Sequence, residues 1–153
     1  PLGMLVVLDS ILNRIRVDSA KGRNTYIFID EIYLLFQYEY SANFLFTLWK
    51  RVRKYGAYAT GITQNVDDLL QSHTARTMLA NSEFIVMLNQ ASTDRIELAK
   101  LLNISDLQMS YITNSGAGEG LIKVGRSLVP FRNRFPRNTE LYKLMTTKPG
   151  EGI

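Results

Sequence analysis

The chain has 153 residues, 46% of them hydrophobic and 21% charged, a length and composition typical of one soluble globular domain. It has no cysteine, and no apolar run reaches the roughly 20 residues of a membrane helix, so disulfides, thiolate metal sites and membrane-spanning helices are excluded. The net charge of +4 mildly favours an acidic partner such as nucleic acid or an anionic membrane surface.

The N-terminal residues predict a tag remnant followed by a helix. Pro1-Leu2-Gly3 is typical of what remains when a protease removes a purification tag, so we assign the domain to residues 4–153. From Met4 to Arg16 apolar side chains recur at helical spacing, which predicts an amphipathic helix.

Three apolar segments, separated by helices, predict strands: "TYIFID", "AYATGITQ" and "EFIVMLN". The first reads as a fully buried strand. Ser41 is expected to cap a helix that runs through Tyr55 and ends at Gly56, and residues 66–79 are expected to form a broken helix. Strands that alternate with helices favour a parallel sheet, so we expect all three in one parallel sheet with helices on its faces.

The C-terminal part of the chain predicts shorter elements. Ser105 is expected to begin a short helix, and "GEGLIKVGRSLVPFRNRF" predicts a β-hairpin with its turn near Gly125. Asn138 or Thr139 is expected to cap the last helix. The predicted fold class is therefore α/β, a mostly parallel sheet with flanking helices and a C-terminal β-hairpin.

Polar side chains follow each of the three predicted strands. These residues are Asp30-Glu31, Gln64-Asn65 and Asn89-Gln90. Because parallel strands end at the same edge of a sheet, and ligands of such sheets bind beyond that edge, the pattern predicts a binding site there.

An apolar strand that ends in Asp-Glu is the Walker B pattern of nucleoside triphosphatases. Asp30 would hold Mg²⁺, usually through water, and Glu31 would orient or deprotonate the water that attacks the γ-phosphate of ATP. The alternative is that the two carboxylates only begin a helix, where negative charge is favourable. Gln64 favours the Walker B interpretation, because its amide closes the next strand and is placed to sense the γ-phosphate.

Four segments together resemble one family. They are "YIFIDEIYLLF", "WKRVRKYGAYATGITQNVDDLL", "NSEFIVMLNQ" and "GEGLIKVGRSLVPFRNRF". Their order and spacing are similar to the C-terminal part of the conjugative ATPases of type IV secretion systems, the fourth VirB component and its Gram-positive relatives. These ATPases belong to the RecA-like group of P-loop NTPases that includes HerA and FtsK. The resemblance implies a RecA-like fold and a hexameric motor that uses ATP and Mg²⁺.

The resemblance assigns roles to individual residues. Asp30 would be the Mg²⁺-coordinating Walker B carboxylate, Glu31 the catalytic base and Gln64 the motif glutamine. The segment "KRVRK" matches the position of an arginine that acts on the neighbouring subunit, and Arg53 is the first choice, with Arg51 second. By itself that segment would be interpreted as the solvated face of an amphipathic helix.

Two later arginines, Arg126 and Arg132, lie where related proteins carry a basic motif after the last strands. They are candidates for phosphate sensing and cofactor binding. A surface hairpin without such a role is an equally good interpretation of the same residues.

The chain departs from the family pattern because it contains no GxxxxGK[ST] phosphate loop. "GAGEG" is better read as a turn. We therefore interpret the chain as part of an ATPase domain after its phosphate loop, inactive by itself. The alternatives are a fragment of a coupling protein or of a HerA/FtsK-type DNA translocase, or a non-catalytic docking domain of the same fold.

The resemblance also implies partners and a location. The full-length protein would act in the cytoplasm at the cell membrane, with other type IV secretion components including the coupling protein, with proteins of the inner or cell membrane, and with DNA or protein as cargo. Without the phosphate-loop strand, we expect the second and third strands either to pair with each other or to drive self-association through their unpaired edges.

Overall fold

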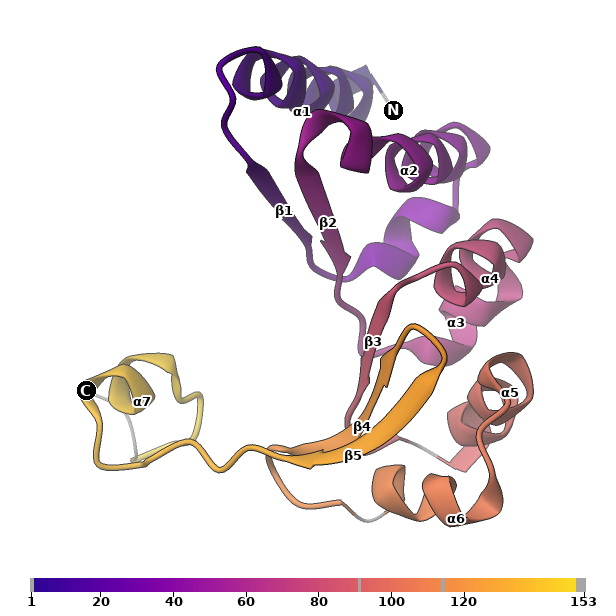
Figure 1. The fold of residues 1–153 in the computed structure, drawn as a ribbon, viewed down its shortest axis with the longest axis vertical. Coiled ribbons are helices and arrows are strands. Elements are labelled where there is room, and N and C mark those ends of the chain that lie inside the picture. Colours follow the sequence, from indigo (N-terminus) through magenta and orange to yellow (C-terminus); the bar gives the residue numbers. More distant parts are fainter. Residues whose placement is uncertain (1, 91, 114, 151–153) are drawn as a thin grey trace. The chain divides into compact units, whose positions relative to one another are not determined.

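The chain divides into two structural units, Pro1–Ser82 and Glu83–Ile153. The computed structural model describes residues 2–90, 92–113 and 115–150. Both units combine helices and strands, so the predicted α/β class is confirmed (Figure 1).

The first unit alternates helices with two strands. In chain order its elements are α1 (Leu2–Ala20), β1 (Thr25–Ile29), the 3-10 helix η1 (Ile32–Phe36), α2 (Glu39–Arg51), the 3-10 helix η2 (Val52–Tyr55), β2 (Ala57–Gly61), α3 (Val66–Gln71) and α4 (His73–Ala80). α1 is longer than predicted at both ends, and α3 and α4 are the predicted broken helix.

The start of α2 differs from the prediction. Tyr38 occupies the N-cap position, and Ser41 lies inside the first turn. The hydroxyl of Ser41 donates to the carbonyl oxygens of Leu35 and Tyr38, at 2.5 and 3.0 Å, so it binds acceptors of the preceding turn and does not cap the helix. The end is as predicted, because Gly56 adopts the left-handed φ of 62° that terminates η2.

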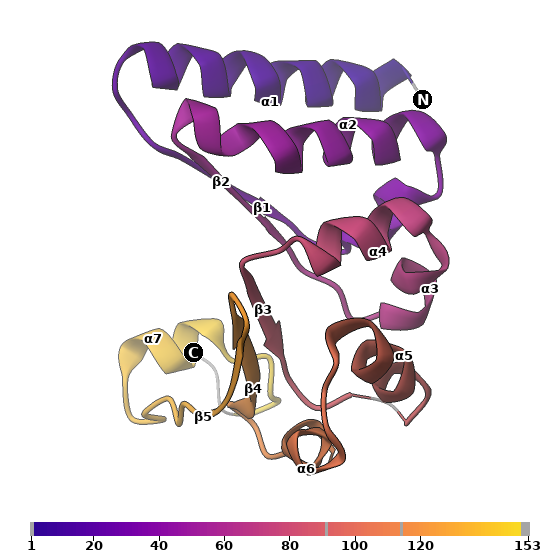
Figure 2. The same cartoon turned by 45° about the vertical axis from the view of Figure 1, so that its right-hand side comes forward.

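The two strands of the first unit are parallel, with Thr25 opposite Ala57 and Ile29 opposite Gly61. One face of this sheet packs against α1 and α2, which lie side by side over it (Figure 2). The core there contains Ile15 of α1, Leu48 of α2 and Ala57 of β2. Apolar residues at helical spacing on both helices make this contact possible.

The other face of the same sheet is exposed within the described part of the unit. Tyr26, Phe28 and Tyr58 have exposed fractions of 64%, 70% and 56%. The rings of Tyr26 and Tyr58, which are opposite each other in the strand register, stack with centroids 5.1 Å apart. The prediction of a fully buried first strand is therefore wrong, because only alternate residues of β1 meet the helices.

A second core holds the segment that follows β1. Ile32 of η1 is 5% exposed and packs in one cluster with Leu45 of α2, Leu69 of α3, and Ala75 and Met78 of α4. The residues just after the first strand are thus anchored by three helices.

The second unit is built on an antiparallel sheet. Its elements are β3 (Phe84–Met87), α5 (Ser92–Leu102), α6 (Asp106–Met109), the 3-10 helix η3 (Ser110–Ile112), β4 (Glu119–Val124), β5 (Ser127–Arg132) and α7 (Glu140–Met145). The strand order is β3-β4-β5, and both pairings are antiparallel.

The third predicted strand, β3, therefore does not belong to the parallel sheet. It pairs with β4, so that Phe84 faces Val124 and Met87 faces Leu121. Of the two alternatives for the second and third strands, direct pairing with each other is wrong for the same reason, since β2 and β3 lie in different sheets. The C-terminal hairpin supplies backbone hydrogen-bond partners along one edge of β3.

The local predictions for the second unit are confirmed. The hairpin turns at Gly125, whose φ is 57°. Ser105 accepts a hydrogen bond from the backbone N–H of Gln108 in a capping box, and Thr139 accepts one from the N–H of Tyr142.

Candidate active site

The backbone on both sides of Asp30 and Glu31 is hydrogen-bonded to one residue, Ile62, which follows β2. The backbone N–H of Ile62 donates to the carbonyl of Ile29 at 2.8 Å, and the carbonyl of Ile62 accepts from the N–H of Ile32 at 3.0 Å. Asp30 and Glu31 are the only residues between these two bonds. The parallel pairing of β1 and β2 thus fixes the position of the Asp-Glu pair.

The backbone of Glu31 is strained. Its φ of 47° and ψ of 46° lie in the left-handed region, which costs energy for a residue with a side chain. Its N–H donates to Oδ1 of Asp30 at 3.0 Å. Its Oε2 atom is buried and has no hydrogen-bond partner among the residues that the structure describes. A carboxylate oxygen left in this state is costly, so a ligand or a water molecule would be a favourable partner for it.

Packing against Gly61 positions the residue after Glu31. A Cβ atom on Gly61 would lie 2.6 Å from Cδ1 of Ile32, which is too close. Glycine therefore allows Ile32 to enter the core directly beside β2. The sequence analysis missed Gly61 and Ile62. A glycine inside a strand pattern is a signal of close backbone approach, but its neighbour becomes known only from the strand register.

Gln64 lies three residues beyond β2, at the same sheet edge as Asp30 and Glu31, because β1 and β2 are parallel. Its side chain is exposed. The residues on either side of it are fixed, since Oγ1 of Thr63 accepts from the N–H of Asn65 at 3.1 Å and Asn65 caps α3. Asp30, Glu31 and Gln64 thus all follow the carboxyl ends of the two paired strands.

The two arginines of "KRVRK" precede β2, at the amino ends of the two parallel strands, whereas Asp30 follows the carboxyl end of β1. Arg51 is the last residue of α2 and Arg53 lies in η2, and both are exposed. The two ends of β2 are about 13 Å apart, at 3.3 Å per residue. Arg53 is thus remote from the Asp30 of its own chain. Basic residues at a helix C-terminus are also favourable by themselves, because they complement the helix dipole.

The hairpin separates the other two arginine candidates. Arg126 lies in the turn next to Gly125, whereas Arg132 lies at the far end of β5 and pairs with Glu119, with 2.8 Å between Nε and Oε1. The distance along the strand is about 20 Å, so one phosphate group could not contact both. The two residues therefore cannot form a joint phosphate sensor within one chain.

Among the described residues, no group of three or more histidine, aspartate or glutamate side chains is arranged to hold a metal ion. A Mg²⁺ site of the Walker B type does not need such a group, because this ion takes one or two carboxylates and completes its shell with phosphate oxygens and water. The exposed carboxylate of Asp30 fits that requirement. None of the described helices has the length and apolar character needed to cross a membrane.

Comparison with known proteins decides the family. The family model of the TraG P-loop domain matches residues 1–118. The chain belongs to the TraG P-loop domain family. This confirms the resemblance to conjugative transfer ATPases that the four sequence segments indicated.

A solved structure agrees with this assignment. The structure of VirB4 of Thermoanaerobacter pseudethanolicus matches with a TM-score of 0.76 and 26% sequence identity, over 85% of this chain. The match covers 36% of the VirB4 chain, so this chain spans about a third of that protein's length. None of the curated proteins compared with the chain matched it.

Proposed function

We propose that this TraG-type P-loop domain carries the Walker B half of an ATP-hydrolysing site in a type IV secretion motor. The observation that carries the proposal is the restrained Asp30–Glu31 pair, with its strained backbone and its buried, unpartnered Glu31 oxygen. A carboxylate that is held in an unfavourable state at a sheet edge is typical of a functional site.

The site residues act by positioning and by proton transfer. Asp30 would hold Mg²⁺, which when bound would supply positive charge against the phosphates of ATP. Glu31 would accept a proton from the attacking water or orient it, and Gln64, after the carboxyl end of β2, would sense the γ-phosphate. A docking domain would have no need of this combination.

Arg53 acts on the site of the neighbouring subunit, with Arg51 as the second choice. Its position at the opposite edge of the sheet from Asp30 supports this role, because an arginine there cannot reach the site of its own chain but is exposed to a neighbour. A planar cation supplied from a second subunit stabilises the charge of the transferring phosphoryl group and couples hydrolysis to assembly into a hexamer.

The family supports a cellular context of type IV secretion and conjugative transfer. We place the full-length protein in the cytoplasm at the cell membrane, where it would act with the coupling protein and with membrane components to move DNA or protein. Arg126 and Arg132, on separate ends of the hairpin, are retained as individual cofactor-binding candidates.

Replacement of Glu31 by glutamine in the full-length protein tests the proposal. Glu31→Gln should abolish steady-state ATP turnover but leave ATP binding intact, because it removes the base and retains the metal ligand Asp30. The 153-residue chain should show negligible turnover, because the backbone N–H groups and lysine of a phosphate loop supply most of the phosphate affinity. Turnover of the 153-residue chain that disappears in Glu31→Gln would contradict the second expectation, and an active full-length Glu31→Gln would overturn the proposal.

A further inference from the structure

A small groove lies between α1 and α2 in the first unit, in the part that precedes the two strands. It holds about 70 Å³, less than half of an engineered cavity of about 150 Å³ that binds benzene, so it has room for one small apolar group. Its floor is apolar and is formed by Leu12, Ile15, Phe44, Leu48 and Val52. The rest of its lining is exposed and consists of Arg16, Thr47, Arg51 and Tyr55. The apolar floor thus lies between two arginines, one from each helix.

The groove is held by the core of the unit. Ile15 is 1% exposed and Leu48 is 2% exposed, and both pack in one cluster with Ala57 of β2. The backbone N–H of Thr25 donates to the carbonyl of Gly56 at 3.2 Å, which joins the turn after α1 to the end of η2. The groove is therefore a feature of two packed helices and not of a loose loop.

Positive charge is concentrated around this groove. Residues 14–23 and 50–54 contain eight basic residues and one acidic residue, a formal charge of +7, whereas the whole chain carries +4. The two segments meet, because η2 packs against α1. Their one acidic residue, Asp18, is already bound by Arg14 and Arg23. The surface is thus far more basic than the rest of the chain.

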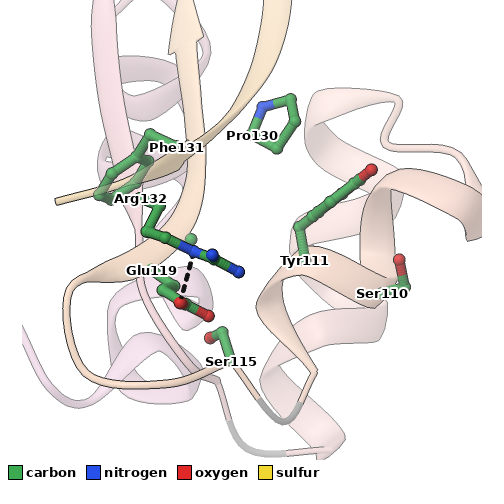
Figure 3. A pocket seen from close by; sticks show the side chains of 8 residues that line it. Ser110, Tyr111, Ser115, Glu119, Pro130, Phe131 and Arg132 are labelled. Atoms are coloured by element: carbon green, nitrogen blue, oxygen red, sulfur yellow. Dashed lines mark ion pairs between the residues drawn. The ribbon is translucent and has the colours of Figure 1, made fainter. Parts of the chain in front are cut away.

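The cations beside the groove have no carboxylate partner. Arg16, Arg51 and Lys54 form no ion pair with any residue that the structure describes. In the hollow of about 320 Å³ in the second unit, by contrast, Arg132 is paired with Glu119, with 2.8 Å between Nε and Oε1 (Figure 3). The helix dipole accounts for basic residues in the last turn of α2, but α1 has none in its last turn, so it does not account for Arg16. An anionic partner would neutralise these charges.

The apolar floor indicates which kind of anionic partner fits. The phosphates of a nucleic acid bind to a basic surface without an apolar group that would fill a groove. A lipid surface likewise presents no single side chain that fits between Arg16 and Arg51. A peptide segment with an apolar residue among carboxylates matches both features, because its side chain fills the groove and its charges complement the rim.

We propose that the groove between α1 and α2 docks an acidic segment of a partner protein. One apolar side chain of the segment lies in the groove, and flanking carboxylates pair with Arg16 and Arg51. The proposal goes beyond ATP hydrolysis and does not depend on the role of Glu31.

The test measures fluorescence anisotropy of a labelled synthetic peptide, with one leucine between glutamates, as the 153-residue chain is added. Two control peptides replace either the leucine by glycine or the glutamates by glutamine. The first peptide should bind at least about tenfold more tightly than each control, because one control loses a buried leucine side chain and the other loses the charge pairing. Its affinity should also fall as the salt concentration rises.

Variants separate the two contributions. Arg16→Glu should weaken binding of the acidic leucine peptide by about tenfold or more, whereas Lys143→Glu makes the same change of charge on α7 and should have no effect. Thr47→Trp places a ring over the groove without a change of charge, so it should lower the affinity to that of the leucine-free peptide. Asn43→Trp is the matched control, because Asn43 is exposed one turn earlier on α2 and does not line the groove.

Several results would overturn the proposal. Equal binding of the acidic peptides with and without leucine would show that the surface acts by charge alone. Displacement of the peptide by a lower concentration of duplex oligodeoxynucleotide, or of phosphatidylglycerol vesicles, would assign the surface to nucleic acid or to a membrane. A shift toward monomer in light scattering of Arg16→Glu would show that a second copy of the chain occupies the groove. If Arg16→Glu fails to fold, the comparison of Thr47→Trp with Asn43→Trp still decides.

Discussion

At the scale of single residues, Ile62 and Gly61 hold the Asp-Glu pair, although neither carries a reactive group. Ile62 forms backbone bonds to Ile29 and Ile32, and Gly61 leaves the space that Ile32 occupies. Their contribution is to fix a strained backbone at Glu31. Such strain persists only where the surrounding structure enforces it.

Gly61→Ala should therefore affect both stability and turnover. The added methyl would displace Ile32 from its core and lower the free energy of unfolding by about 1–3 kcal/mol, as overpacking usually does. In the full-length protein it should reduce kcat more than it raises KM, because Glu31 moves with Ile32. Gly61→Ala combined with Ile32→Val should recover part of both losses, since valine lacks the clashing Cδ1 atom. Denaturant unfolding and steady-state kinetics provide the measurements, and an unaltered kcat in Gly61→Ala would exclude a positioning role.

Asp18 is a second residue whose role can be tested. It is 6% exposed, and its carboxylate oxygens accept from Nε of Arg14 at 2.7 Å and from Nη2 of Arg23 at 2.6 Å. The hydrogen bond from Arg14 lowers the pKa of Asp18, and the charges of both arginines add to this effect against the opposing effect of burial. The carboxylate thus links the end of α1 to the residues before β1.

The lowered pKa determines the pH dependence of stability. A carboxyl group with a folded pKa below its unfolded value of 3.8 stabilises the fold above that value, and the stabilisation is lost as the pH falls through the folded pKa. Asp18→Asn should therefore lower the Tm at neutral pH, and its difference from the unchanged chain should shrink below about pH 4. Asp9→Asn on the exposed side of the same helix serves as control. Thermal unfolding between pH 2 and 7 measures both, and equal effects of the two variants would contradict the role of Asp18.

At the scale of elements, each sheet leaves apolar surface uncovered within its own unit. In the first unit β1 pairs only with β2 among the described residues, so the outer edges of both strands are unpaired. The face that carries Tyr26, Phe28 and Tyr58 is exposed as well. Unpaired edges beside exposed aromatic residues are templates for association with another chain.

We therefore expect the 153-residue chain to self-associate. Light scattering at high micromolar concentration should give a mass above that of one chain, and Phe28→Lys should shift the population toward monomer because a charge would then lie on the exposed face. Substitution of Lys50, which lies over the ring of Phe46 on α2 and away from the exposed face of the sheet, provides the control. A clean monomer under the same conditions would reject this expectation.

At the scale of the whole molecule, we propose that a neighbouring subunit completes the site. Arg53 precedes β2, whereas Asp30 and Glu31 follow β1, so in the proposed hexamer the arginine of each site would come from the neighbouring subunit. Hydrolysis would then depend on how subunits meet, and not only on the residues of one chain.

Mixing of two inactive full-length variants tests this arrangement. Arg53→Ala should reduce turnover by a factor on the order of 10³ or more, the usual contribution of an arginine supplied by a neighbour. When Arg53→Ala subunits are mixed with Glu31→Gln subunits, some interfaces combine an intact glutamate with an intact arginine, and activity should return in part. Arg51→Ala tests the second choice in the same assay. If the mixture shows no rescue and Arg53→Ala is nearly as active as the unchanged protein, "KRVRK" is only the solvated face of a helix.

The sequence by itself determined the features that depend on neighbouring residues. The polar pair after an apolar strand, the helix end at Gly56, the cap at Ser105 and the turn at Gly125 follow from local chemistry and were predicted correctly. The four segments that indicated the family were likewise sufficient, because their order and spacing are properties of the sequence.

Only the tertiary structure decided which segments meet. The apolar pattern of β3 suits a parallel or an antiparallel neighbour equally, and its pairing with β4 depends on a hairpin more than 30 residues away. The exposed face of β1, the contact of Gly61 with Ile32 and the bonds of Ile62 depend on the register of β2 in the same way. Strand pairing and packing are non-local contacts, and local periodicity carries no information about the partner.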